Sequence, residues 1–539
     1  MKCLIHKMMA AMIFLILLSP FTVNADTLRI GVAAEPSSTD PHFHNLGPNN
    51  ALAYHFFDRL IHQDEKQRLY PGLAESWKAV GPTTWVFNLR KGVKWHDGSP
   101  FTAADVIYTI ERIPNVPNSP SSFTSFVKQI KSYDVINDHE IKFETQTTFP
   151  LMDAYLSSFS IVSKAAAEKF IKDNPDIAKD IYTIPSKYYN DGTLLNGTGP
   201  YKFVEWVKGD KIVLVKNPDY WGEKAIWDKV IFKPISSGSA RMAALLSGDV
   251  DIIDKVPTAD IEGLKKNDKI TVSQGISNRV IYLHIDTDRD DSPHVTDING
   301  NKWGKNPLKD QRVRLAISKA INREAIASRV MQGLAIPAAQ SLPDGFFGSS
   351  EKLTPEKYDP AGAKQLLADA GYPDGFGLTI HGPNNRYIND AKIAQAIAQF
   401  LTKVGIKTKV ETMPKNVYFS RATQLEFSFM LLGWGSDTGE PGSTMIKLLH
   451  TYDKENSMGT SNRGRFSDPK FDAMIEDAMT TVDAAEREKK LKACSEYVFG
   501  EKLGFIPIHF QVNTWGAKTG IRYQTRTDEY TLANFVKKD

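Results

Sequence analysis

The 539-residue sequence predicts an α/β fold that is divided into two or three domains. Short strand-like runs alternate with amphipathic helix patterns along the whole chain, and this mixture is typical of α/β architecture. The chain is also longer than the roughly 250 to 300 residues at which a single hydrophobic core stops growing. Its 41% of hydrophobic residues is enough to fill several cores.

The first 25 residues have the layout of a secretory signal peptide. Lys2 and Lys7 give a positive start, residues 8–18 form an apolar run, and residues 23–25 supply small side chains for cleavage. The run is shorter than the about 20 residues of a membrane-spanning helix. Because Cys3 precedes the run, where a lipid-modified cysteine would follow it, we expect no lipid anchor. We predict cleavage after Ala25 and export to the periplasm.

Composition narrows the choice of partners. Lys and Arg number 66 against 63 Asp and Glu, a net charge of +3, which gives no argument for a nucleic-acid partner or an anionic membrane. The chain has two cysteines, and cleavage would remove Cys3. Cys494 would then be alone, so we expect no internal disulfide.

Five hydrophobic runs predict strands, at residues 27–33, 85–89, 212–216, 250–253 and 407–411. In the second run Trp85, Phe87 and Leu89 alternate with more polar residues, as in a half-buried strand. Gly92 and Gly98 follow at positions that suit tight turns. We therefore expect these segments to build the fold and not to bind a ligand.

Three segments predict helices. In residues 390–404, Ile393, Ile397, Phe400, Leu401 and Val404 share one helical face, between a cap at Asn389 or Asp390 and an end at Gly405. A second helix begins at Asp359-Pro360 and stops at Gly371, and a third covers about 310–323. The polar stretch 286–304 predicts an exposed insertion in a loop.

Common catalytic motifs are absent from the sequence, namely G-x-x-x-x-G-K-[ST], G-x-G-x-x-G, G-x-S-x-G and H-E-x-x-H. Their absence argues against the commonest ATPases, dehydrogenases, hydrolases and zinc proteases, although a triad from distant residues would leave no local motif. His42 and His44 are either a metal or haem pair or, as we favour, polar loop residues after Asp40-Pro41. Likewise Asp249 and Asp251 indicate a turn into a strand, and residues 486–492 a solvated helix face. We expect no cofactor and no metal.

Seven blocks carry a resemblance to a known family: residues 70–77, 85–98, 101–106, 197–201, 216–221, 313–317 and 433–437. The first reads YPGLAESW, the second WVFNLRKGVKWHDG and the last GWGSD. In this order they resemble the extracellular solute-binding proteins of ABC importers, of the peptide, opine and nickel group (family 5), including dipeptide- and oligopeptide-binding proteins. The resemblance spans nearly all of the chain after residue 25.

The resemblance implies a large two-lobed periplasmic binding protein fold of the type II-like kind, with an extra domain inserted in the first lobe. We expect lobe I at residues 26–56, 185–282 and 504–539, the extra domain at 57–184, and lobe II at 283–503. Two strands would cross between the lobes near Tyr282 and near Ile506-Pro507. The lobes of such a receptor close over the ligand, and the protein is not an enzyme.

The resemblance also implies ligand-binding residues. Asp437 matches an aspartate that pairs with a peptide's α-ammonium, behind Gly435, which permits close approach of backbone and ligand. Ser436 lies between them, and Trp434 would wall the pocket. The alternatives are that Asp437 caps a turn and that Trp434 belongs to the core. Arg386 matches, more loosely, an arginine that binds the peptide carboxylate. If Arg386 lies on the surface instead, longer peptides are the expected ligands. Residues 35–45 match a segment that contributes to the cleft.

The function that the resemblance implies is capture of a di- or short oligopeptide and its delivery to the membrane subunits of an importer, by a monomer. Haem, a metal chelate, glutathione or an opine is an alternative ligand within the same family. A secreted hydrolase, or a sensor or chaperone without an importer, is an alternative from another class.

Overall fold

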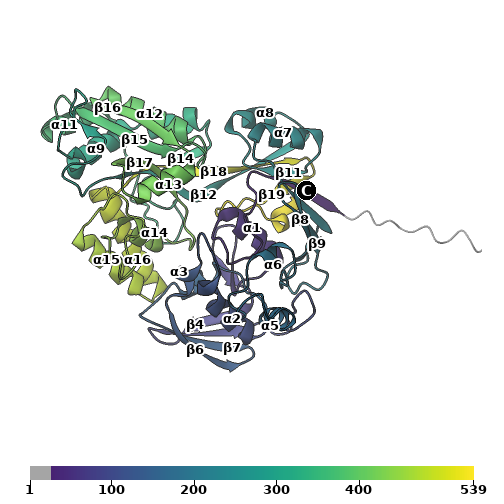
Figure 1. Ribbon diagram of the computed structural model, residues 1–539. Helices are drawn as coiled ribbons and strands as arrows, with labels where there is room; N and C mark the ends of the chain where they lie inside the picture. The colour runs from purple at the N-terminus through teal and green to yellow at the C-terminus, as the bar shows by residue number, and fades with distance from the viewer. Residues whose placement is uncertain (1–25) are drawn as a thin grey trace, which may run out of the picture.

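One twelve-stranded sheet runs through two bodies of the molecule, and a separate small sheet forms a third (Figure 1). The computed structural model describes residues 26–539, so the predicted signal peptide and Cys3 lie outside the described residues. The large sheet has the order β13-β15-β17-β12-β18-β11-β1-β10-β9-β8, with β16 beside β15 and β14 beside β18. The predicted α/β class is therefore confirmed.

The body that we call the first lobe contains one end of the large sheet. Its strands are β1 (Thr27–Val32), β8 (Tyr201–Val207), β9 (Lys211–Lys216), β10 (Lys229–Pro234) and β11 (Ile252–Asp254), with the small pair β19 (Ile521–Tyr523) and β20 (Val536–Lys538). Its helices are α1 (Gly47–Phe56), α6 (Lys187–Asn190), α7 (Gly238–Ser247) and α8 (Ile261–Leu264). Leu28, Ile30 and Phe56 are fully buried in its core.

The second lobe contains the other end of the sheet, at the upper left of Figure 1. Its strands are β13 (Val295–Thr296), β14 (Ala335–Pro337), β15 (Phe376–Pro383), β16 (Ile406–Met413) and β17 (Phe429–Trp434). Its helices are α9 (Gln311–Ala320), α10 (Arg323–Ala325), α11 (Pro360–Asp369), α12 (Asp390–Lys403), α13 (Lys415–Thr423), α14 (Gly442–Leu449), α15 (Pro469–Thr480) and α16 (Ala484–Ser495).

The small-sheet domain lies at the bottom of Figure 1. Its sheet has the order β4-β5-β7-β6, formed by β4 (Ala74–Ala79), β5 (Thr84–Leu89), β6 (Ile130–Asn137) and β7 (Glu140–Thr145). The hairpin β2 (Ile61–Gln63) and β3 (Leu69–Pro71) precedes it, and α2 (Ala103–Arg112), α3 (Thr124–Val127), α4 (Met152–Leu156) and α5 (Lys164–Asp173) accompany it. Its core comes from residues between Leu60 and Ile161, whereas Phe170 and Ile184 pack in the first lobe's core. The division into domains at residues 57 and 184 stays a prediction.

Two long antiparallel strands, β12 (Ile270–Ile285) and β18 (Ile506–Lys518), are shared by both lobes. Toward the first lobe β18 pairs with β11, and toward the second lobe β12 pairs with β17. Their register shifts between Ile276 and Val280, so residues 277–279 form an irregular segment. Tyr282 and Pro507, near the crossings predicted from sequence, face each other on the second-lobe side of this segment.

The elements predicted from local patterns are confirmed. All five predicted strands are present within a few residues, and the helix predicted at residues 390–404 is α12. Asp359 caps α11 by accepting a hydrogen bond from the Gly362 amide at 2.8 Å. The helix predicted at 310–323 ends earlier, at Ala320, because Asn322 caps a new short helix.

Two expectations about exposure need correction. The stretch 286–304 is not simply an exposed loop, because Asp286, Ser292 and Val295 are buried and residues 295–296 join the sheet as β13. The 486–492 cluster on α16 is mostly solvated, but Arg487 is buried. As expected, Asp251 follows a turn at Gly248, and it pairs with Arg29 and Lys518.

The loop at residues 35–45 is anchored by a buried ion pair. Arg112 and Asp40 are both fully buried, with Nη2 to Oδ2 at 2.7 Å and Nη1 to Oδ1 at 3.1 Å. His42 accepts from Arg112 at 2.8 Å through Nδ1 and donates through Nε2 to the Ser160 carbonyl at 2.7 Å. His42 is thus a buried, neutral loop residue, while His44 contacts Ser37 nearer the surface. Within residues 26–539 no cluster of three or more His, Cys, Asp or Glu is arranged to hold a metal.

Cys494 is buried and unpaired in the described chain. Among the helices of residues 26–539, none has the length and apolar character needed to cross a membrane.

Candidate functional site

A cavity of about 830 Å³ lies where the two lobes, the small-sheet domain and the shared strands meet. The first lobe contributes residues such as Asn50 and Glu529, the small-sheet domain Gln63, and the second lobe Tyr387 and Asp437. A volume of several hundred Å³ is typical of sites that enclose a small ligand. The cavity is therefore the candidate binding site.

All five residues predicted from the sequence line this cavity: Arg386, Trp434, Gly435, Ser436 and Asp437. From the predicted loop, Glu35, Pro36 and Asn45 line it as well. Trp434 ends β17, is half-buried, and also packs against the second lobe's core. Both interpretations of Trp434, as a wall of the pocket and as a core residue, therefore fit the structure. What these residues bind stays a prediction.

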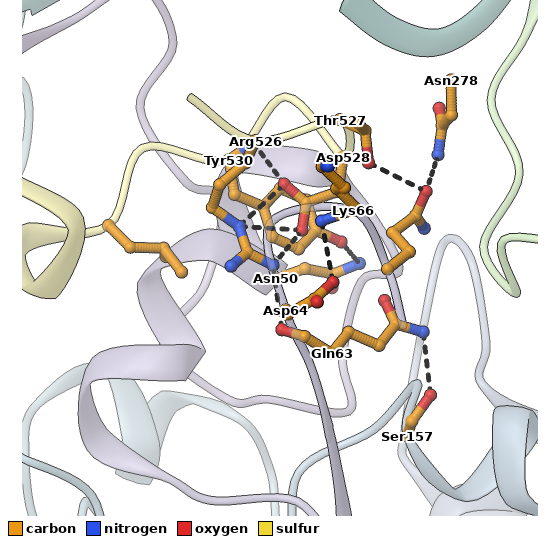
Figure 2. A network of polar contacts seen from close by, with 12 residues as sticks. Asn50, Gln63, Asp64, Lys66, Ser157, Asn278, Arg526, Thr527, Asp528 and Tyr530 are labelled. Carbon is orange, nitrogen blue, oxygen red and sulfur yellow. Dashed lines mark hydrogen bonds and ion pairs between the residues drawn. The ribbon is translucent and has the colours of Figure 1, made fainter. Parts of the chain in front are cut away.

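The backbone after β17 is held from across the cavity. The Ser436 carbonyl accepts from Gln67 Nε2 at 3.0 Å and from Asn278 Nδ2 at 2.7 Å, and the Asp437 carbonyl accepts from Gln63 Nε2 at 3.2 Å. Figure 2 shows Gln63 and Asn278 together with Ser157, to which Gln63 also donates. These bonds join the small-sheet domain and the shared strands to the second lobe.

Gly435 lies in a closely packed position. A Cβ atom at this position would lie 3.0 Å from Asn278 Oδ1 and 3.3 Å from Arg279 Nη2. The neighbours of Gly435 in the structure are side chains of β12, and the predicted close approach of a ligand at this glycine stays a prediction.

The Asp437 side chain is free to bind a ligand. Its carboxylate is exposed and makes no hydrogen bond or ion pair within the described chain. The turn is instead capped by Ser436, whose Oγ accepts from the Gly439 amide at 3.1 Å. The interpretation of Asp437 as a turn-capping residue therefore has no support in this geometry.

Arg386 is positioned by the start of α12. Its backbone amide and that of Tyr387 donate to Asp390 Oδ2 at 2.9 and 3.0 Å. The half-buried guanidinium lies 5.2 Å from the Tyr387 ring and makes no hydrogen bond within the described residues. Burial, and then the nearby charge of Arg279, lower the pKa of Arg386. An anion in the cavity would relieve both effects.

One charged pair of the site was not predicted from the sequence. Glu529 accepts from Arg279 Nε at 3.0 Å, Ser277 Oγ at 2.8 Å and Gln511 Nε2 at 3.2 Å. Burial would raise the pKa of Glu529, but Arg279 and Lys255 outweigh it and lower the pKa to about 2. Because Arg279 and Glu529 are 250 residues apart, no local motif could have predicted this pair.

A second carboxylate lies where the second lobe meets the small-sheet domain. Glu440 accepts from Arg487 at 2.9 Å through Oε1, while its Oε2 is buried without a partner in the described chain. Burial raises the pKa of Glu440 to about 7; Arg487 opposes this shift and Asp153 of α4 adds to it. Burial raises the pKa of Asp153 as well.

We expect the stability of the protein to depend on Glu440 between about pH 4.5 and pH 7. The folded chain binds the proton more tightly than the unfolded chain, so this contribution to stability is lost as the pH rises through that window. The loss should be on the order of 1–3 kcal/mol. The Glu440→Gln variant should not show this pH-dependent loss of stability when its unfolding by urea is measured over the same pH range. An identical pH profile of the wild type and this variant would contradict the prediction.

Comparison with known proteins gives consistent matches. The model of the bacterial extracellular solute-binding proteins, family 5 Middle, matches residues 68–456. Heme-binding protein A of Haemophilus influenzae is 27% identical over 490 residues, covering 86% of this chain and 83% of the relative. Glutathione-binding protein GsiB of Pectobacterium atrosepticum is 27% identical over 490 residues, covering 88% and 86%.

A solved structure agrees over nearly the full length of both chains. The ABC transporter-associated periplasmic binding protein DppA from Helicobacter pylori, in complex with the peptide STSA, is 26% identical with a TM-score of 0.75. The match covers 95% of this chain and 98% of that one. The predicted two-lobed periplasmic binding protein fold is thereby confirmed.

Proposed function

The chain belongs to the bacterial extracellular solute-binding proteins of family 5, and on this basis we propose that it captures a di- or short oligopeptide in the cavity between its lobes. Proteins of this family are non-enzymatic substrate-binding components of ABC importers. The observation that carries the peptide proposal is the presence of two unpaired, opposite charges, Asp437 and Arg386, in one cavity.

In this proposal the peptide's α-ammonium pairs with Asp437 and its carboxylate with the planar guanidinium of Arg386. Trp434 and Tyr387 supply aromatic walls, and water fills the space around the peptide's side chains. Both charges then gain a partner when the lobes enclose the ligand and exclude solvent. The irregular segment at residues 277–279 is where we propose that the shared strands bend.

We further propose that the chain is exported by a signal peptide cleaved after Ala25 and acts in the periplasm as a monomer. The loaded, closed form would dock on the membrane subunits of the importer and release an unchanged ligand.

The test is the replacement Asp437→Asn, with peptide binding measured by calorimetry. Because the change removes a charge-assisted contact, the affinity for free-amine peptides should fall about tenfold or more, which is about 1.4 kcal/mol. N-acetylated peptides should bind the wild type as weakly as free-amine peptides bind the variant.

A matched control is Asp374→Asn, at an exposed position that does not line the cavity. It should bind peptides like the wild type. Equal affinity of the wild type for acetylated and free-amine peptides would exclude Asp437 as the ammonium partner. Native mass spectrometry of the freshly purified protein would identify a retained ligand and so separate a peptide from haem or glutathione.

A further inference from the structure

The charged side chains that line the cavity are unbalanced. Five cations line it without an ion pair to any carboxylate of residues 26–539: Arg59, Lys255, Arg386, Lys415 and Arg463. Two lining carboxylates lack a cation partner in the same residues, Asp437 and Glu35. Glu35 is held by the Trp206 indole at 2.8 Å and the Gly209 amide at 2.9 Å.

The other acidic residues of the lining are already compensated. Glu529 pairs with Arg279 at 3.0 Å and Asp254 with Arg241 at 3.6 Å. Asp528 pairs with Arg526, as Figure 2 shows. The five unpaired cations are therefore opposed only by the two unpaired carboxylates of the lining, and the cavity has an excess of positive charge.

Two of these cations are incompletely satisfied. Arg59 is only 4% exposed; it donates to the Ser157 carbonyl at 2.7 Å and lies 3.8 Å from the centre of the Tyr54 ring, but its Nε is buried without a partner. Arg463 also has a buried Nε without a partner in the described chain. A buried cation that lacks an anionic partner is costly, so an anion in the cavity would be stabilising.

The cations lie on both sides of the cavity. Lys255 lies close enough to Glu529 for its charge to lower the pKa of that carboxyl. Arg386 lies close enough to Glu529 for the carboxylate to oppose the lowering of the Arg386 pKa. Glu529 itself is paired with Arg279. Lys415 begins α13 in the second lobe, and Arg463 lies 6.0 Å from the Phe419 ring of the same helix. Burial, and then the charge of Lys415, lower the pKa of His44, which belongs to the first lobe's loop. Lys415 and Asn45 of that loop both line the cavity.

We infer that the ligand is acidic, carrying at least one anionic group in addition to the carboxylate that Arg386 binds. This inference rests on the proposed capture of a peptide in the cavity. Asp437 can neutralise a single ammonium, whereas a single terminal carboxylate would leave most of the cations unpaired. A peptide with a Glu or Asp side chain matches this distribution of charge, and the positive field of the cavity would also speed its arrival.

The test compares Ala-Glu and Glu-Glu with Ala-Ala and Ala-Lys, and the same substitutions in tripeptides, by calorimetry. Acidic peptides should bind at least tenfold more tightly than neutral or basic ones, and added salt should reduce this preference. In Lys415→Gln and in Lys255→Gln the ratio of the affinity for Ala-Glu to the affinity for Ala-Ala should fall severalfold. Lys409→Gln, an exposed lysine outside the cavity, is the control.

The outcomes separate this inference from the proposed function. If Ala-Ala or Ala-Lys binds as tightly as Ala-Glu, the ligand is not selected for acidity and the inference is wrong, although peptide capture stands. If no peptide binds but haem, with its two propionates, binds and is weakened by Lys415→Gln, the anionic preference stands and the peptide proposal fails. If haem binding is equally unaffected by both lysine variants, the inference fails as well.

Discussion

Replacing Arg112 with Met should lower the free energy of unfolding by about 3–5 kcal/mol at neutral pH. The change leaves the fully buried Asp40 carboxylate without its cation. It also removes the donor to His42 Nδ1 at 2.8 Å. Ser186 and the His42 amide still donate to Asp40, but neither carries charge. Urea denaturation measures the loss from the shift of the midpoint.

The effect should reach the binding site, because Asp40 belongs to the loop at residues 35–45 whose two ends line the cavity. Peptide binding by folded Arg112→Met should therefore be weaker than in the wild type. The double variant Asp40→Asn/Arg112→Met should recover part of the lost stability, since a neutral pair leaves no uncompensated buried charge.

The matched control is Arg312→Met, which breaks an ion pair with Asp310 on the surface of α9. Because the Arg312 side chain is 53% exposed, this pair should contribute about 0–1 kcal/mol. Similar losses in Arg112→Met and Arg312→Met would mean that the buried pair does not anchor the loop.

Local patterns in the sequence predicted the regular elements well. In α12, Ile393, Ile397 and Leu401 recur at helical spacing and are fully buried. In β5, Trp85, Phe87 and Leu89 alternate and are likewise buried. Here the residues that decide the structure are neighbours in the chain, so one sequence suffices. The five predicted site residues came from the family resemblance, and all of them line the cavity.

The remaining features depend on contacts between distant residues. The burial of Asp286 depends on Ser428, whose carbonyl accepts from the Asp286 amide and whose hydroxyl contacts Ser292. Burial, and then the charge of Arg112, which lies 70 residues further along the chain, lower the pKa of His42 and keep it neutral. The excess of cations in the cavity arises from side chains on both lobes. Composition alone does not single out most of these residues. No spacing rule predicts such a sum.

Replacing Glu529 with Gln should also destabilise the protein by about 3–5 kcal/mol at pH 7, because it leaves the largely buried Arg279 unpaired beside Arg386. Glutamine keeps the shape of the side chain and can still accept from Ser277. The loss of unfolding free energy therefore measures the effect of removing the charge of Glu529. Glu75→Gln, at an exposed position of β4, is the control and should change stability by less than about 0.5 kcal/mol.

The pH dependence gives a second readout that a change of packing would not produce. The pKa of Glu529 is lowered to about 2 in the folded protein, below the usual value of about 4.3. As the pH falls, the unfolded chain therefore binds the proton first. The stabilisation, about 3 kcal/mol, is complete above about pH 5 and is lost progressively toward pH 2.

Urea denaturation of the wild type and Glu529→Gln between pH 7 and pH 4 should accordingly show a difference in unfolding free energy that is constant above about pH 5 and shrinks below it. Glu529 ties Ser277 and Arg279 of β12 to Gln511 of β18, at the irregular segment of both shared strands. A variant with wild-type stability at pH 7 would show that this buried charge does not hold the segment together, and the proposed bending point would lose its main support.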